Sequence, residues 1–155
     1  MILVDSSVWV DFFSPSPSRG GAELRRMIDE NEPFVLTGVV VAEVLQGLTR
    51  DATRIEGFLA QCDMIEPGGF ETYREAAAIY RVARARGISL KTIDTLIAAT
   101  ALEHGASVFT LDADFSRIAR ISGLALYRPS MLCTTKKPYQ RHYTTEAIFD
   151  VFAAA

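Results

Sequence analysis

Carboxylates directly follow two of the apolar stretches that the sequence predicts to be strands. The run 2–4 stops on Asp5, and the β-branched run 107–111 stops on Asp112, which is followed two residues later by Asp114. In an open parallel sheet, ligands bind just beyond the carboxyl ends of the strands. Asp5 could instead simply end its strand and help to cap the next helix, and Asp112 is also well placed as a cap. Because capping uses one carboxylate oxygen, the other stays free for chemistry.

A third carboxylate, Asp94, stands in the first turn of a helix predicted over 92–104. It shares a helical face with Ile97, Ala98 and Ala101, which are apolar or small and should pack inward. A carboxylate on such a face is costly unless something compensates it. The alternative is that Asp94 only complements the helix dipole, since first turns favour acids.

Glu43 is less conspicuous. It lies in a predicted helix that Thr37 or Gly38 opens and that runs to about Leu48. The apolar arc of that helix consists of Val40, Val41, Val44, Leu45 and Leu48, whereas Glu43 shares the other face with Gln46, Gly47 and Arg50. Periodicity alone therefore predicts an ordinary exposed glutamate, and Glu43 joins the other acids only if its helix starts at the same sheet edge.

Such a group of acids would repel itself and raise its own pKa values unless a cation were bound. Oxygen ligands without histidine or cysteine select Mg²⁺, with Mn²⁺ as a possible substitute. The chemistry that follows is phosphodiester hydrolysis by a metal-activated water. His104 and His142 look peripheral, and neither is near a nucleophilic serine or cysteine pattern, so a histidine-based mechanism is not indicated.

Strands and helices alternate along the chain, which predicts right-handed crossovers and a parallel sheet covered on both faces. Strands are expected at 2–4, 34–36, 64–65, 107–111 and 124–127, and helices at 8–13, 22–30, 37–48, 51–61, 70–86 and 92–104. The first helix would be capped by Ser6 or Ser7, and the fourth by Asp51. Gly87 and Gly105 are expected to end the two helices before them, because glycine enters the left-handed region cheaply.

The 155 residues have the size of one domain, and 49% hydrophobic with 23% charged residues is an ordinary globular composition. We expect the domain to span 1–128 and a tail of unknown role to span 129–155, with a linker at 136–138 and a short helix at 145–152. No stretch is long and apolar enough for a membrane span or reads as an export signal, so we expect a cytoplasmic protein. Cys62 and Cys133 carry no metal signature, and Cys62 is expected in the core.

A net charge of −3 argues against nucleic-acid binding through bulk electrostatics. It is compatible with acids concentrated in a metal site and bases around its rim. The local basic cluster consists of Arg81, Arg84, Arg86 and Lys91. It reads either as a solvated helix end, with cations at the negative pole of the dipole, or as a set of contacts to RNA phosphates.

Four short motifs together resemble a known family. They are Ile2-Leu3-Val4-Asp5-Ser6-Ser7-Val8-Trp9-Val10-Asp11-Phe12-Phe13, Val41-Ala42-Glu43-Val44-Leu45-Gln46-Gly47, Ile93-Asp94-Thr95-Leu96-Ile97-Ala98-Ala99 and Thr110-Leu111-Asp112-Ala113-Asp114-Phe115. In order and spacing they are similar to PIN domains, specifically the VapC-type toxins of bacterial toxin–antitoxin pairs, over residues 1 to about 128.

The resemblance implies a three-layer α/β/α fold with a mainly parallel central sheet and the activity of a Mg²⁺-dependent endoribonuclease. It maps the acidic quartet of the family to Asp5, Glu43, Asp94 and Asp112, with Asp114 as an accessory acid and Ser6 as the accessory polar residue. It also implies a homodimer and an antitoxin whose C-terminal segment occupies the acidic groove. The open face of Glu43 would then be that groove, which periodicity does not show.

Other functions remain open at this stage. A PIN-like module that binds or regulates through a protein partner, without turnover, would keep the same fold. A phosphotransferase of the haloacid dehalogenase kind needs Asp-x-Asp after the first strand, where this chain has Asp5-Ser6-Ser7. A receiver-type phosphoacceptor needs an aspartate at the end of the third strand, where this chain has Met64-Ile65-Glu66. Neither of the two phosphoryl-transfer alternatives fits.

Overall fold

The computed structural model describes residues 1–48 and 52–129. In that part of the chain the strands are β1 (Ile2–Val4), β2 (Val35–Leu36), β3 (Asp63–Met64) and β4 (Ser107–Phe109). The helices are α1 (Ser6–Phe12), α2 (Arg19–Asp29), α3 (Gly38–Gly47), α4 (Ala52–Leu59), α5 (Phe70–Ala85), α6 (Thr92–Glu103) and α7 (Ala113–Ser122). The predictions for Asp51, Cys133, His142 and the tail from residue 130 onward lie outside the described residues.

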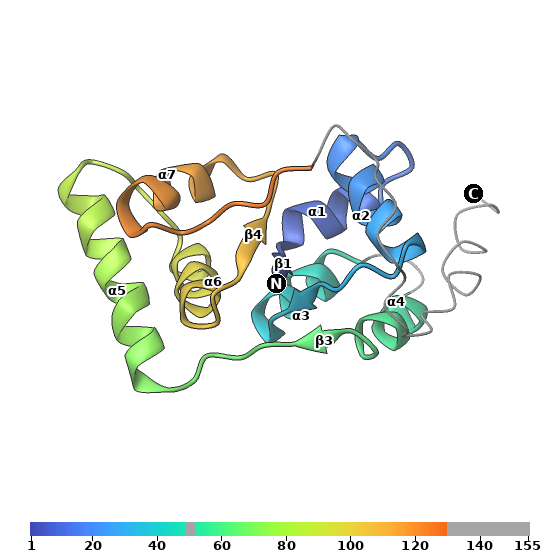
Figure 1. The fold of residues 1–155 in the computed structure, drawn as a ribbon, viewed down its shortest axis with the longest axis horizontal. Coiled ribbons are helices and arrows are strands. Elements are labelled where there is room, and N and C mark those ends of the chain that lie inside the picture. Colours follow the sequence, from blue (N-terminus) through green and yellow to red (C-terminus); the bar gives the residue numbers. More distant parts are fainter. Residues whose placement is uncertain (49–51, 130–155) are drawn as a thin grey trace.

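The four strands form one parallel sheet in the order β3-β2-β1-β4. β1 and β4 are in register through Leu3 with Val108 and Val4 with Phe109. The chain steps from β1 to β2 to β3 in one direction and then returns across the sheet to β4. Right-handed crossovers therefore place the helices before β3 on one face and those between β3 and β4 on the other. Figure 1 accordingly shows α5 and α6 on the left and α1, α2 and α4 on the right. The helix α7, which follows β4, packs against α5 and α6 on the left.

This topology confirms the predicted three-layer α/β/α fold and locates its binding edge. Because the strand order reverses between β1 and β4, the crevice of an open parallel sheet opens beyond the carboxyl ends of these two strands. Asp5 directly follows β1, and Asp112 comes three residues after the end of β4.

Several predicted boundaries move. The helix expected over 8–13 begins at Ser6, because its N-cap is Asp5 rather than Ser6 or Ser7. The strand expected over 107–111 ends at Phe109. The stretch 124–127 makes only an isolated parallel bridge between Leu126 and Val108 instead of a fifth strand. α5 ends one residue early, and Gly87 takes a φ of +71°, as expected for the glycine that terminates a helix.

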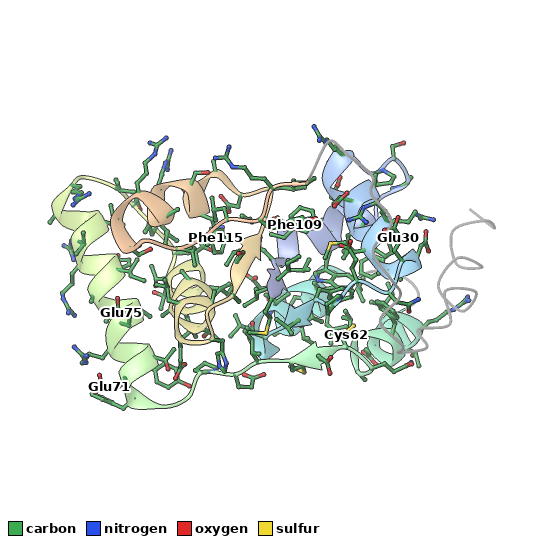
Figure 2. The ribbon with its side chains drawn as sticks, in the orientation of Figure 1. Glu30, Cys62, Glu71, Glu75, Phe109 and Phe115 are labelled. Carbon is green, nitrogen blue, oxygen red and sulfur yellow. The ribbon has the colours of Figure 1, made fainter. Side chains whose placement is uncertain are left out.

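The core beneath the sheet is rich in aromatic side chains. Trp9 of α1 is fully buried and packs with its ring centroid 5.9 Å from both Phe34 and Phe58. Cys62 is buried beside this core, as predicted, and burial raises the pKa of its thiol to about 12. Phe109 of β4 and Phe115 of α7 are also buried, and they anchor both ends of the segment that carries Asp112 (Figure 2). No helix in the described part of the chain is long and apolar enough to cross a membrane.

Candidate metal centre

Asp5 is held rigidly at the carboxyl end of β1. Its backbone N–H donates to the Phe109 carbonyl over 2.9 Å and so extends the pairing between β1 and β4. Its carboxylate is only 3% exposed, and Oδ2 accepts from the Ser7 hydroxyl at 2.5 Å, the Thr110 hydroxyl at 2.9 Å and the Ser7 backbone N–H at 3.2 Å. Within the described residues Oδ1 accepts no hydrogen bond, so it is the oxygen that remains for a ligand.

Asp94 is the buried acid that the helical pattern predicts. It is 5% exposed in the first turn of α6, and Ile97, Ala98 and Ala101 on the same face are buried as expected. Oδ2 of Asp94 is buried and, within the described residues, has no hydrogen-bond partner. The pKa of Asp94 is raised to about 6, first because burial disfavours the charged form. The charges of Asp112, Asp5 and Asp114 add to the increase, and Lys91 opposes it.

Asp112 and Asp114 are positioned by the start of α7. Asp112 is its N-cap, because Oδ1 accepts from the Asp114 backbone N–H at 2.8 Å, which confirms the predicted capping role. Asp114 also accepts from Arg117 Nη1 over 2.8 Å. One carboxylate oxygen from each of Asp94, Asp112 and Asp114 lies within 4.8 Å of the others. The carboxyl edge of the sheet thus gathers these three acids, with the charge of Asp5 close enough to act on Asp94.

These side chains fit a hard divalent cation. An acid buried without a hydrogen-bond partner is costly unless a cation or a donor compensates it, and Asp94 Oδ2 has that deficit. The neighbouring donors are all carboxylate oxygens, which Mg²⁺ and Mn²⁺ prefer over the softer metals. A cation between them would also relieve the repulsion that adds to the burial-driven rise in the pKa of Asp94.

Glu43 lies outside this group. It is half-buried in α3, which follows β2 and is capped by the Thr37 hydroxyl. Its carboxylate is not one of the three that lie within 4.8 Å of one another. Its role in the quartet therefore rests on the resemblance and stays a prediction.

Of the four predicted basic residues, one lies at the acidic site and three lie outside it. Lys91 Nζ lies 3.8 Å from Asp112 Oδ2, at the rim of the site. Arg81, Arg84 and Arg86 are exposed at the carboxyl-terminal part of α5 and just after it, and in the described residues none forms an ion pair with an acid. They remain candidate RNA contacts.

Sequence reasoning missed two residues that contact Asp5. The resemblance points to Ser6 as the accessory polar residue, whereas the structure places the hydroxyls of Ser7 and Thr110 on Asp5. A signal for Ser7 was available, because a serine two residues after a helix-capping aspartate can donate to it. Thr110 carried no local signal, because it is 105 residues away from Asp5 in the sequence.

Comparison with known proteins agrees with the fold. The chain belongs to the PIN-domain family, whose profile matches residues 2–121. A curated relative, ribonuclease VapC11 of Mycobacterium tuberculosis, is 37% identical over 128 residues, which are 80% of this chain and 96% of the relative. The VapC ribonuclease Mb1587 of Mycobacterium bovis matches to the same extent.

Solved structures share the fold at lower sequence identity. VapBC2 from Rickettsia felis, bound to a DNA fragment of its promoter, superposes with a TM-score of 0.64 at 19% identity, over 82% of this chain and 98% of that one. FitAcB from Neisseria gonorrhoeae superposes with a TM-score of 0.62 at 24% identity, over 85% of this chain and 100% of that one. At these identities the likeness concerns the fold alone.

Proposed function

We propose that the protein is a metal-dependent endoribonuclease, a hydrolase that acts as the toxin of a toxin–antitoxin pair. The curated relatives at 37% identity are named as VapC ribonucleases, and the chain covers 96% of their length. The observation that carries the proposal is the buried Asp94, whose Oδ2 lacks a partner in the described residues and which lies beside Asp112 and Asp114 at the switch point of the sheet. This is a binding edge built for a cation and for the phosphate of a substrate.

The cation is Mg²⁺, with Mn²⁺ as a substitute. Asp94 and Asp112 would hold it, Asp5 would contribute Oδ1, and Glu43 and Asp114 would complete the site or a second position. When bound, the cation neutralises charge on the scissile phosphate and activates water for hydrolysis.

The side chains of the chain itself set up this chemistry. Asp5 accepts three hydrogen bonds on Oδ2, and these fix the orientation of its carboxylate. Asp112 uses Oδ1 to cap α7 and keeps Oδ2 for the site. Lys91 at the rim offers a positive charge to a phosphate oxygen, and Arg81, Arg84 and Arg86 bind the RNA backbone further out.

The proposed partners follow from the same relatives. The protein from Klebsiella pneumoniae, with a TM-score of 0.61 at 22% identity, is described as a toxin–antitoxin complex. By analogy a cognate antitoxin protein binds this chain and blocks the acidic groove. We further propose a homodimer, a nuclease domain over 1–128 separate from the tail at 129–155, and action in the cytoplasm, where the RNA substrate is found.

The test is RNA cleavage by purified protein. Mg²⁺ should support cleavage and a chelator should stop it, and Asp94→Asn should lower the rate at least about 100-fold, the scale for loss of one key electrostatic group. Asp29→Asn, which changes an exposed aspartate at the end of α2, should leave the rate unchanged. Cleavage that persists with chelator or in folded Asp94→Asn contradicts the proposal. A protein that binds Mn²⁺ but leaves every RNA intact would instead be the non-catalytic PIN-like module.

A further inference from the structure

Two hydroxyl groups from residues 103 positions apart in the sequence converge on one oxygen of Asp5. The Ser7 hydroxyl lies 2.5 Å and the Thr110 hydroxyl 2.9 Å from Asp5 Oδ2, and the two hydroxyl oxygens are 3.3 Å apart. Ser7 is in the first turn of α1, and Thr110 directly follows β4. Neither residue belongs to the predicted acidic set, and both surround an acceptor that is 3% exposed.

Each hydroxyl also has a backbone partner, for which it is the acceptor. Ser7 Oγ accepts the Leu111 backbone N–H over 3.0 Å, and Thr110 Oγ1 accepts the Asp112 backbone N–H over 2.9 Å. Each hydroxyl therefore has its single proton left to donate, and Asp5 Oδ2 is the carboxylate oxygen within reach. With the Ser7 backbone N–H added, Oδ2 is saturated, and the carboxylate cannot rotate without breaking these bonds.

The same two hydroxyls tie Asp5 to the segment that carries the other acids. By accepting the N–H groups of Leu111 and Asp112, they hold the turn between β4 and α7 against the end of β1. Asp112 then caps α7 through the Asp114 N–H. A continuous set of hydrogen bonds thus runs from Asp5 to the acids of α7 and fixes their relative positions.

We propose that Ser7 and Thr110 are positioning residues of the metal centre. They keep Asp5 Oδ2 engaged in the fold, so that Oδ1 is presented to the cation, and they hold Asp112 at a fixed distance from Asp5. The inference rests on the proposed function, because it assumes that the acids bind a divalent cation. Partners that orient a metal ligand in this way commonly change metal affinity 10- to 100-fold when they are removed.

Mn²⁺ binding to the metal-free protein, followed by electron paramagnetic resonance or calorimetry, tests the inference without RNA. Ser7→Ala and Thr110→Val should each weaken Mn²⁺ binding by about 10- to 100-fold. Thr110→Ser keeps the hydroxyl and should restore affinity close to that of the parent protein. If Thr110→Val does not fold, Ser7→Ala, which leaves Thr110 in place, carries the same test.

The matched control is Thr72→Val. The Thr72 hydroxyl donates to Glu103 Oε2 over 2.7 Å between the start of α5 and the end of α6, far along α6 from Asp94. Thr72→Val removes the same kind of hydroxyl–carboxylate hydrogen bond, and it should lower Tm while leaving Mn²⁺ affinity unchanged. If Thr110→Val and Ser7→Ala also lower only Tm, their role is structural and the inference is overturned.

Asp94→Asn separates this inference from the proposed function. If Asp94→Asn loses Mn²⁺ while both hydroxyl variants bind it like the parent, only the positioning role fails. If Asp94→Asn binds Mn²⁺ as tightly as the parent, the metal centre itself is misassigned and the proposed function fails with it.

Discussion

Lys91 Nζ lies 3.8 Å from Asp112 Oδ2, so a cation that the sequence groups with arginines of α5 in fact stands at the acidic site. Its side chain is 69% exposed, which lets it reach toward a bound molecule. Its charge also opposes the rise in the pKa of Asp94. Lys91 is therefore placed between the candidate metal ligands and any RNA backbone that approaches them.

We expect Lys91→Ala to weaken RNA binding mainly at low salt. Each lost phosphate contact should make the slope of log K against log salt shallower by roughly 0.7 for a single strand. The measurement is fluorescence anisotropy with labelled RNA over a salt series, in an Asp94→Asn background that prevents cleavage. Arg74→Ala is the control, because Arg74 pairs with Glu71 at the far end of α5, where Glu71 and Glu75 point outward (Figure 2). If Lys91→Ala leaves this slope unchanged, Lys91 does not contact the RNA phosphates.

The raised pKa of Asp94 predicts a specific dependence of stability on pH in metal-free protein. The folded-state pKa of about 6 lies above the ordinary 3.8, so the folded protein binds this proton more tightly than the unfolded chain does. This stabilisation is complete below about pH 4 and is lost as the pH rises to about 6 and beyond. Asp94→Asn removes this titration. Between these pH values the free energy of unfolding of the variant should therefore rise relative to that of the parent.

Urea unfolding at pH 4, 5, 6 and 7.5 measures the difference in free energy of unfolding between the parent and Asp94→Asn. Saturating Mn²⁺ should reverse its sign at pH 7.5, because a cation bound to Asp94 stabilises the folded parent but not the variant. Parallel stability curves for the two proteins in the absence of metal would show that Asp94 titrates normally and is not buried as described.

Most of the fold was predictable because its strands and helices are local patterns. The apolar runs, the caps at Thr37 and Asp112 and the stop at Gly87 each depend on a few neighbouring residues. The expected strand at 124–127 was wrong, because an apolar run of that length forms a strand only where a partner edge continues beside it. Here Leu126 makes a single bridge to Val108.

The site was predictable only in part. Asp94 was identified because a carboxylate on an inward helical face is visible in the helical period, and the structure buries it. The contact of Thr110 with Asp5 depends on the register between β1 and β4, which no local pattern contains. Glu43 was included by resemblance alone, and its role in the site remains a prediction.

Arg26 joins three glutamates on one side of the molecule. It lies 2.8 Å from Glu23, 2.6 Å from Glu30 and 3.0 Å from Glu32, and the Tyr127 hydroxyl donates to Glu23 over 2.7 Å. The hydrogen bond from Arg26 is the main cause that lowers the pKa of Glu23, whose side chain is only 11% exposed. This network connects α2 to the segment that follows α7.

Arg26→Met should lower the free energy of unfolding by about 1–2 kcal/mol, because it leaves the little-exposed Glu23 with fewer donors, while solvent screens the more exposed pairs. Arg74→Met, which breaks the exposed pair with Glu71, should leave stability unchanged within error. Both are measured by urea unfolding at pH 7. Equal effects of the two substitutions would mean that the network adds nothing beyond an ordinary surface ion pair.

Two glycines inside helices should respond in opposite ways to alanine. A Cβ on Gly21 of α2 would lie 2.9 Å from the Phe12 backbone and 2.9 Å from Asp11 Oδ2, whereas a Cβ on Gly57 of α4 meets no atom of the described residues within 4 Å. Both substitutions gain helix propensity, so the difference between them isolates the close packing of α1 and α2. Gly57→Ala should stabilise by about 0.5–1 kcal/mol, and Gly21→Ala should destabilise by about 1–3 kcal/mol because the rigid backbone of α1 must shift. Thermal and urea unfolding decide between these signs, and a stabilised Gly21→Ala would show that α1 and α2 are not packed this closely.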